Sequence, residues 1–500
     1  MSREQEWALS SEAVDGANPV GDRWIFGGLL FLLVWAPLPL GSNRIWAIGL
    51  LVGLAVLLLM GTVVVWRRVP QAAMQRLALF KWPLLCLAGF VCLSWVQTIP
   101  LPANWVGVIS PVAALAQAPA VWMTLSLDVF QSRIMAGLSF AYFAAFIVTA
   151  ITVRDGARLD RLAQVLVWSG VLQAVVGVVL YSIKAEYILF FSSVSHSNLI
   201  GTFINRNHVA AYLNMCLSVG IGLMLARLGS EVHKHAGWKE RLKRAIEFLL
   251  STKIRLRLLL VVMVIALVVT RSRMGNSAFF ISLMVVGLLG VVLMRKTAPR
   301  TIALIVSLVI IDILVVGSAV GIEQVAERIQ QTQVSGAVGD SSTEESIEAR
   351  TEAARTALPM VRDFVWAGSG GGSFYNVFMG YRTAAYGSSF VDHTHNDYVE
   401  IAADYGLIGL GFLGLLVSGT LWTVVKVMAQ RRSSLPRGIA FGVAMAIVTL
   451  LMHSTVDFNL QIPANALTIV VILAMGWIAR FLPSPERKPG GKISQNGLNG

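Results

Sequence analysis

Hydrophobic runs of about 20 residues follow one another down most of the chain, separated by polar connections. A run of this length lets a helix cross a bilayer. Backbone groups in lipid must bond internally, and runs rich in Leu, Val and Gly achieve this as helices rather than barrel strands. We therefore predict an all-α polytopic membrane protein with about 12 transmembrane helices. The expected spans are 24–40, 45–65, 80–99, 132–153, 162–182, 207–227, 255–270, 276–294, 301–320, 404–427, 438–457 and 464–482.

The polar connections divide the chain into five parts. The N-terminal segment is polar and acidic and lacks the basic start of a signal peptide, so we do not expect it to be cleaved. The longest connection is expected to form one large periplasmic loop, and the Pro- and Gly-rich tail to be disordered. The parts are a cytoplasmic segment (1–23), helices 1–9 (24–320), the periplasmic loop (321–403), helices 10–12 (404–482) and a cytoplasmic tail (483–500).

Composition and charge support this interpretation. Only 13% of the residues are charged, whereas a soluble domain carries roughly 25%, so a soluble enzyme and a disordered chain are both excluded. With both termini placed in the cytoplasm, 29 of the 40 Lys and Arg residues lie in cytoplasmic segments and 10 lie outside. This bias favours that orientation. The net charge of +13 is spread over separate segments, so we expect contact with membrane lipid and not with nucleic acid.

Arginines on the outer side are unusual under the same bias. Arg206 lies at the outer end of the sixth span, and Arg271 and Arg273 lie in the hinge between the seventh and eighth spans. A guanidinium is always charged and binds phosphate oxygens through two parallel hydrogen bonds. Charged groups at membrane depth commonly mark substrate paths. These arginines are candidates for binding an anion, and the alternative is that they reach toward lipid head groups.

A second polar cluster, His393-Thr-His-Asn-Asp-Tyr-Val-Glu400, precedes the tenth span. Histidine titrates near neutrality and can accept a proton from a hydroxyl group. His393, His395 and Asp397 alternate like a metal-ligand string, but no second group of ligands accompanies them, so we expect no metal. His395 and Asn396 can instead cap the following helix.

Three further features lie in the second half of the sequence. The segment 368–374 is rich in glycine but lacks the lysine of a phosphate-binding loop, so it indicates a tight loop or close backbone approach. Arg350 lies on a probable helix among glutamates, where exposed ion pairs contribute little. His453 and Asp457 are four residues apart at the end of the eleventh span, and we expect them on one helical face.

These residues also resemble those of a known family. His395-Asn396, nine residues and then Gly406-Leu-Ile-Gly409 resemble the signature around the essential histidine of the O-antigen ligase and Wzy-type polymerase superfamily, which comprises bacterial integral-membrane glycosyltransferases. The resemblance covers roughly residues 200–465. Similar blocks are 201–208, 272–275, Arg350 with 368–374, and 453–465, the last being similar to members from exopolysaccharide clusters.

The resemblance implies a GT-C type fold, no metal or other cofactor, and a glycan donor carried on undecaprenyl diphosphate. The acceptor is a hydroxyl group of the lipid A core in ligases and of another repeat unit in polymerases. The implied diphosphate-binding residues are Arg206 and Arg273, with Arg271 and Arg350 as second choices. The resemblance implies that His395 is the essential histidine, and our hypothesis is that it acts as the base, with Asn396 or Asp397 orienting it. Further candidates are Asn205, His208, Gly370, His393, His453 and Asp457.

Three functions follow from the sequence as hypotheses. The first is an O-antigen ligase-like glycosyltransferase, multi-pass in the bacterial inner membrane. The second is a Wzy-type exopolysaccharide polymerase, which keeps the chemistry and changes the acceptor. The third is a transporter of lipid-linked glycan, which predicts ionisable residues at mid-membrane in several spans, where Asp312 is nearly alone.

Overall fold

The computed structural model describes residues 19–188, 192–193, 198–227, 252–294, 302, 306, 347–382 and 391–483. Most of the expected ninth span with Asp312, the basic segment 228–251, the first part of the large loop and the tail lie outside the described residues.

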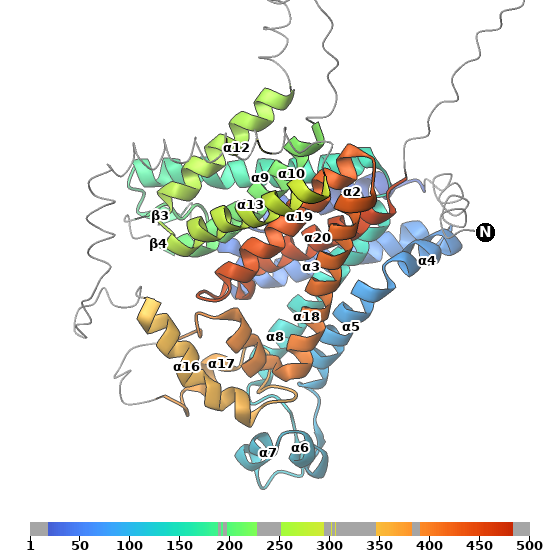
Figure 1. The fold of residues 1–500 in the computed structure, drawn as a ribbon. Coiled ribbons are helices and arrows are strands. Elements are labelled where there is room, and N and C mark those ends of the chain that lie inside the picture. Colours follow the sequence, from blue (N-terminus) through green and yellow to red (C-terminus); the bar gives the residue numbers. More distant parts are fainter. Residues whose placement is uncertain are drawn as a thin grey trace, which may run out of the picture.

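The described chain is built from helices, with two short antiparallel pairs of strands (Figure 1). The strands are β1 (Leu101–Pro102) with β2 (Trp122–Met123) and β3 (Tyr187–Ile188) with β4 (Ser192–Ser193). The helices are α2 (Asp22–Trp35), η1 (Leu40–Ser42), α3 (Ile45–Trp66), α4 (Pro70–Leu79), α5 (Lys81–Val96), α6 (Ala103–Ile109), α7 (Pro111–Gln117), α8 (Val129–Thr152), α9 (Gly156–Ser182), α10 (Arg206–Arg227), α12 (Thr252–Val269), α13 (Arg273–Leu293), α16 (Ile347–Asp363), α17 (Phe374–Phe378), α18 (Asp397–Gln430), α19 (Ser434–His453), η5 (Asn459–Gln461) and α20 (Pro463–Phe481).

The prediction of an all-α polytopic membrane protein is confirmed. In the part of the chain that the structure describes, eight helices are long and apolar enough to cross a membrane, and a ninth span results if α4 and α5, bent by 87°, are counted as one. The expected first and seventh spans form helices that are not among these, because α2 has only 14 residues and α12 begins with three basic residues close together.

The centre of the bundle is the contact between α10 and α19. A Cβ atom on Gly222 of α10 would lie 2.3 Å from the carbonyl oxygen of Gly438 of α19, so only glycine lets the two backbones approach this closely. Small residues at helix contacts are typical of membrane bundles, where van der Waals packing drives association. This contact brings the start of α10 near the end of α19, because the two helices run in opposite directions.

Helix α18 continues well beyond its membrane-spanning part. Its 34 residues correspond to about 50 Å, whereas the hydrocarbon core is about 30 Å thick. The helix is interrupted at Gly406, whose φ of 65° and close approach to the Trp366 carbonyl exclude a side chain. The expected tenth span begins at 404, beside this break, and residues 397–405 form an additional helical segment that leads into the span.

A small lobe formed by α6, α7, α16 and α17 lies at one end of the bundle, toward the bottom of Figure 1. Its own hydrophobic core includes Val106 of α6, Met123 of β2, Met360 of α16, Phe364 directly after α16, and Phe378 of α17. The connection 100–131 and the end of the large loop therefore fold together, although more than 200 residues separate them in the sequence.

Candidate functional site

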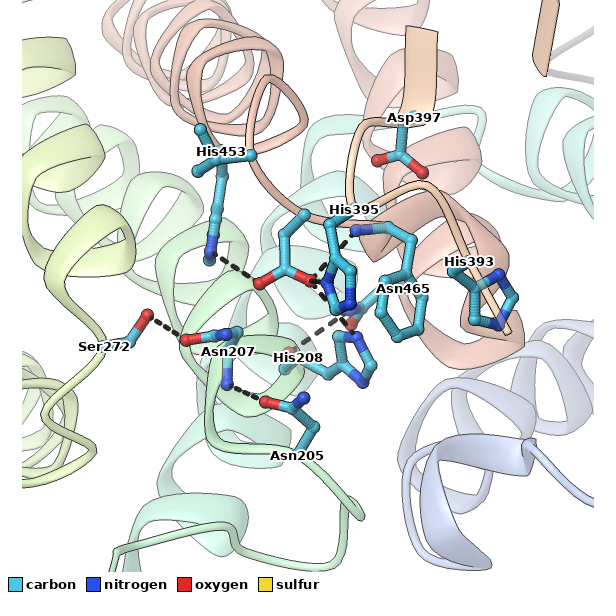
Figure 2. Close-up of polar contacts among 12 residues, drawn as sticks. Asn205, Asn207, His208, Ser272, His393, His395, Asp397, His453 and Asn465 are labelled. Carbon is cyan, nitrogen blue, oxygen red and sulfur yellow. Dashed lines mark hydrogen bonds and ion pairs between the residues drawn. The ribbon is translucent and has the colours of Figure 1, made fainter. Parts of the chain in front are cut away.

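Four predicted site residues meet around the fully buried carboxylate of Asp457, in the turn between α19 and η5. Oδ1 lies 3.8 Å from His208 Nε2 and 4.0 Å from His395 Nδ1. Oδ2 lies 3.4 Å from Arg350 Nη1 and 3.9 Å from His453 Nε2. Figure 2 shows the three histidines gathered around this contact. We call these five residues the Asp457 cluster; they come from α10, α16, α19, the segment before α18 and the turn after α19.

The predicted shared helical face of His453 and Asp457 is wrong, because α19 ends at His453. The backbone N–H of Asp397 donates to the carbonyl oxygens of Ser454 and Asp457, at 3.0 and 3.2 Å. These contacts shape the turn after α19 and attach it to the first residue of α18. The two side chains nevertheless approach each other across the turn.

The Asp457 cluster contains buried polar atoms that have no hydrogen-bond partner among the described residues. They include Nε2 of His208, Nδ1 of His395 and both ring nitrogens of His453, and both amide atoms of nearby Asn459 are in the same state. Such atoms are rare in folded proteins, since each costs about 1–3 kcal/mol when it is left unpaired. Their concentration at one place is typical of a site that binds water or a polar ligand.

His395 is held in a neutral state by its surroundings. Its side chain is 25% exposed, and its backbone has a φ of 52°, which is uncommon for a residue other than glycine. Burial, and then the positive charge of Arg350, lower the pKa of His395 to about 4. The imidazole is therefore unprotonated at neutral pH and has a lone pair that can accept a proton.

His393, two residues earlier, is in the opposite state. Burial lowers its pKa, but the charge and hydrogen bond of Glu400, together with the charges of Asp392 and Asp404, outweigh burial and raise the pKa of His393 to about 9. The His393 Nδ1 to Glu400 Oε1 distance is 2.6 Å, and the ring stacks on Phe458 at a centroid distance of 4.0 Å. The same Phe458 ring also contacts His208 and His395 by its edge or face.

Arg350 is positioned by the lobe. Helix α16 brings it to the turn after α19, where Nη1 donates to the carbonyl oxygen of Val456 at 3.1 Å and faces Asp457. Its side chain is only 12% exposed. The expectation of an ordinary exposed ion pair with neighbouring glutamates is therefore wrong.

The hinge that carries Arg271 and Arg273 is bonded to the start of α10, where Arg206 is the first helical residue. Ser272 Oγ, which also caps α13, donates to Asn207 Oδ1 at 2.7 Å, as Figure 2 shows. The Asn207 backbone N–H in turn donates to Asn205 Oδ1 at 2.8 Å, and His208 of the Asp457 cluster follows directly. The two arginine-bearing segments therefore adjoin the cluster. Arg271 and Arg273 are exposed and Arg206 is half-buried.

Asn396 and Asp397 organise the backbone around His395. Asn396 caps α18 by accepting from the backbone N–H groups of Tyr398 and Val399, as the capping alternative predicted for it. The Asp397 carboxylate is buried and accepts from Ser454 Oγ at 2.6 Å and from the Leu460 backbone N–H at 3.2 Å. Both carboxylate oxygens are used in attaching α18 to the turn. The catalytic role predicted for Asp397 stays a prediction.

The glycine-rich segment 368–374 fastens the lobe to α18. The Asp404 carboxylate accepts from the backbone N–H groups of Gly372 and Phe374, at 2.7 and 3.0 Å. Gly370 has a φ of 113°, and a Cβ atom there would lie 2.2 Å from Ser126 Oγ. In the structure, this segment makes close backbone contacts, and the predicted site role of Gly370 stays a prediction.

A largely apolar cavity of about 410 Å³ lies beside the Asp457 cluster. Residues of α5, α8, α18, α19, η5 and α20 line it, and Asp397, Ser454 and Gln461 are among its polar lining residues. Within the described ranges, no group of three or more His, Cys, Asp or Glu side chains has an arrangement that could hold a metal ion.

The fold and the site define the class: a multi-pass, all-α membrane protein with histidines and arginines gathered at one end of its helices. Within this class, residues 258–414 match the family model described as O-antigen ligase, which confirms the resemblance to the O-antigen ligase and Wzy-type superfamily. The match indicates a glycosyltransferase of the ligase or polymerase type, acting in polysaccharide biosynthesis. It includes Arg273, Arg350 and His395, whereas Arg206 and Asp457 lie outside it. No curated protein matches the chain.

Three residues of this site were not predicted from the sequence. Glu400 lay in the histidine segment without being assigned a role, although its spacing of seven from His393 places both near the start of one helix. Asn207 lay between two candidates, Arg206 and His208. The central position of Phe458 had no local signal, because an aromatic residue next to a polar turn is ordinary in a membrane protein.

Proposed function

We propose that the protein transfers a glycan from undecaprenyl diphosphate to an acceptor hydroxyl at the periplasmic face of the bacterial inner membrane, with both termini cytoplasmic, in the manner of O-antigen ligases. The observation that carries this proposal is the meeting of His395 and Arg350 at Asp457, next to the bonded segments that carry Arg206 and Arg273. In the reaction, the acceptor oxygen bonds to the anomeric carbon, the bond to the diphosphate breaks, and the acceptor proton goes to His395.

The arginines supply the charge that a diphosphate leaving group requires. Arg206, Arg271, Arg273 and Arg350 would bind its oxygens and stabilise the negative charge that develops as the glycosidic bond breaks. Preorganised positive groups are most effective where water is scarce, which applies to Arg350 and the half-buried Arg206. The exposure of Arg271 and Arg273 supports this role, because exposed side chains are accessible to an incoming lipid head group.

The apolar cavity beside the cluster supports a lipid-linked donor. Its lining is suited to a hydrocarbon chain, and it includes Ser454, which lies in the turn that carries Asp457. A donor could therefore place its chain among α5, α8 and α18 while its diphosphate lies at the arginines. The acceptor would be the lipid A core or a growing polysaccharide.

The neutral imidazole of His395 supports the role of general base. A positioned base contributes about 10²- to 10⁴-fold to a rate. We expect His395→Ala to lower glycan transfer in proteoliposomes by that factor, with lipid-linked glycan as donor. His235→Ala, in the basic segment 228–251, is the matched control and should keep the wild-type rate. Transfer at the wild-type rate by His395→Ala would refute the proposal.

A Wzy-type polymerase is the second candidate, and one observation favours it. The block 453–465, which is similar to members from exopolysaccharide clusters, supplies both His453 and Asp457 to the cluster. A deletion strain distinguishes the two acceptors. Loss of long surface polysaccharide with single-repeat glycan remaining supports the polymerase, whereas accumulation of lipid-linked polymer supports the ligase.

A further inference from the structure

His395, as the proposed base, requires a negatively charged group that stabilises its protonated imidazole. Burial and the charge of Arg350 lower the pKa of His395 and so disfavour its protonated form. The imidazole must nevertheless be protonated while the new glycosidic bond forms. A base of this kind needs a fixed negative group near the ring nitrogen that does not face the acceptor. The family resemblance assigned the orienting role to Asn396 or Asp397, but Asn396 caps a helix and both oxygens of Asp397 are engaged elsewhere.

The buried nitrogen of His395 faces Asp457 instead. Nδ1 is without a hydrogen-bond partner in the described structure and lies 4.0 Å from Asp457 Oδ1. This separation is longer than a hydrogen bond, but catalytic hydrogen bonds are often long before substrate binds. With Nδ1 turned toward the carboxylate, Nε2 is the nitrogen that faces the acceptor.

Asp457 is held in place by groups other than His395. Its Oδ1 accepts from the Phe458 backbone N–H at 3.0 Å, and its Oδ2 faces Arg350. The other groups that face it are the side chain of Asn207, which hydrogen-bonds it, and the histidines His208, His453 and, further away, His393. Burial raises the pKa of Asp457, and the charge of Arg350 opposes that rise. A carboxylate secured on both oxygens can hold an imidazole without moving itself.

We infer that Asp457 is the positioning residue of His395. It fixes the tautomer with the proton on Nδ1 and offsets the positive charge after Nε2 has taken the acceptor proton. Asp457 itself gains no proton in this step. The inference rests on the proposed function, because it requires that His395 acts as the base.

A double-mutant cycle tests this assignment. Asp457→Asn should lower kcat by about 100- to 1000-fold and change the KM for the lipid-linked donor by less than about threefold, since the amide disturbs the tautomer and removes the charge. In the His395→Ala background, the same substitution should lower the remaining rate by less than about twofold, because a residue that acts through His395 has nothing left to act on.

Equal losses in the two backgrounds would overturn the assignment, as would a raised KM with an unchanged kcat. Asp457→Glu should recover part of kcat, and it serves in the same cycle if the asparagine variant does not fold. Asp22→Asn removes a buried carboxylate far from the site and should leave kcat per folded molecule unchanged. A wild-type rate in His395→Ala would instead defeat the proposed function, so the two failures are distinguishable.

Discussion

Two fully buried carboxylates, Asp22 and Asp457, differ in how closely their partners approach. Asp22, at the start of α2, accepts from Trp66 Nε1 at 3.0 Å and from Arg154 Nη2 at 2.7 Å, and it also bonds Arg158. The side chain of Asn207 hydrogen-bonds Asp457, but its charged and titratable partners, Arg350 and three histidines, stay 3.4–4.0 Å away. The two sites lie toward opposite ends of α8. Arg154 comes two residues after the end of this helix, whereas the glycine-rich segment packs against its first turns.

The difference separates a structural group from a working one. A buried ion pair with close, complete contacts is fixed, and it has no capacity left for another ligand. A buried carboxylate with long contacts and several unpaired neighbours can tighten around a substrate or a transferred proton.

Asp22→Ala should have the largest effect on stability. It removes the carboxylate that Arg154, only 7% exposed, and Arg158 share, and breaking a buried pair in this way costs about 3–5 kcal/mol. Thermal unfolding in detergent micelles measures the loss. Asp160→Ala is the matched control, because the Asp160–Arg227 pair is partly exposed and worth at most about 1 kcal/mol.

The comparison also requires that Asp457→Ala costs less stability than Asp22→Ala. Arg350 keeps its bond to the Val456 carbonyl when the carboxylate is removed, so it does not become an unpaired buried charge. A loss at Asp457 equal to or larger than that at Asp22 would show that the long contacts are as important for folding as the short ones.

The sequence predicted the helices well because hydropathy is a local property of each run. It failed where a local pattern is overridden by distant contacts. The spacing of His453 and Asp457 is typical of a helix, but α19 ends at His453. The carbonyl oxygens of Ser454 and Asp457 instead accept from the backbone N–H of Asp397, the first residue of α18. Arg350 has glutamates nearby in the sequence, but its position on α16 brings it into contact with Val456, which lies 106 residues later in the sequence.

The sequence indicated which residues belong to the candidate site, but it did not indicate which of them contact one another. His395 was expected from its resemblance to a family signature, and its neighbour Asp397 was the natural choice to orient it. Only the folded chain shows that Asp397 points to Ser454 and Leu460, while Asp457, 62 positions after His395, faces the imidazole. No spacing in a single sequence contains that information.

The two histidines before α18 should give opposite pH dependences of stability. For His393, the pKa of about 9 lies above the unfolded value of about 6.5, so its contribution is complete below pH 6.5 and is lost as pH rises through 9. Glu400, Asp392 and Asp404 are the charges responsible. For His395, the pKa of about 4 lies below the unfolded value, so stability is lost as pH falls from 6.5 toward 4.

Unfolding followed from pH 4 to 10 tests this contrast. The alkaline loss attributable to His393 should be at most about 3 kcal/mol, and His393→Gln should remove it while keeping the acidic loss. His395→Gln should remove part of the acidic loss and keep the alkaline one. If both variants flatten the same side of the profile, the two environments are not distinct.

Ser272→Ala should have the smallest effect and should test whether the arginine-bearing hinge is held by its contacts. Ser272 caps α13 through the Gly275 backbone N–H and bonds Asn207, so its loss should cost about 1 kcal/mol of stability and raise the KM for the lipid-linked donor several-fold. Ser433→Ala is the matched control, because Ser433 occupies the same position before α19 and its side chain makes no capping bond. An equal cost at both serines would mean that the bond to Asn207 does not hold the hinge. A large fall in kcat at unchanged KM would place Ser272 with the reacting groups of the Asp457 cluster rather than with the arginines.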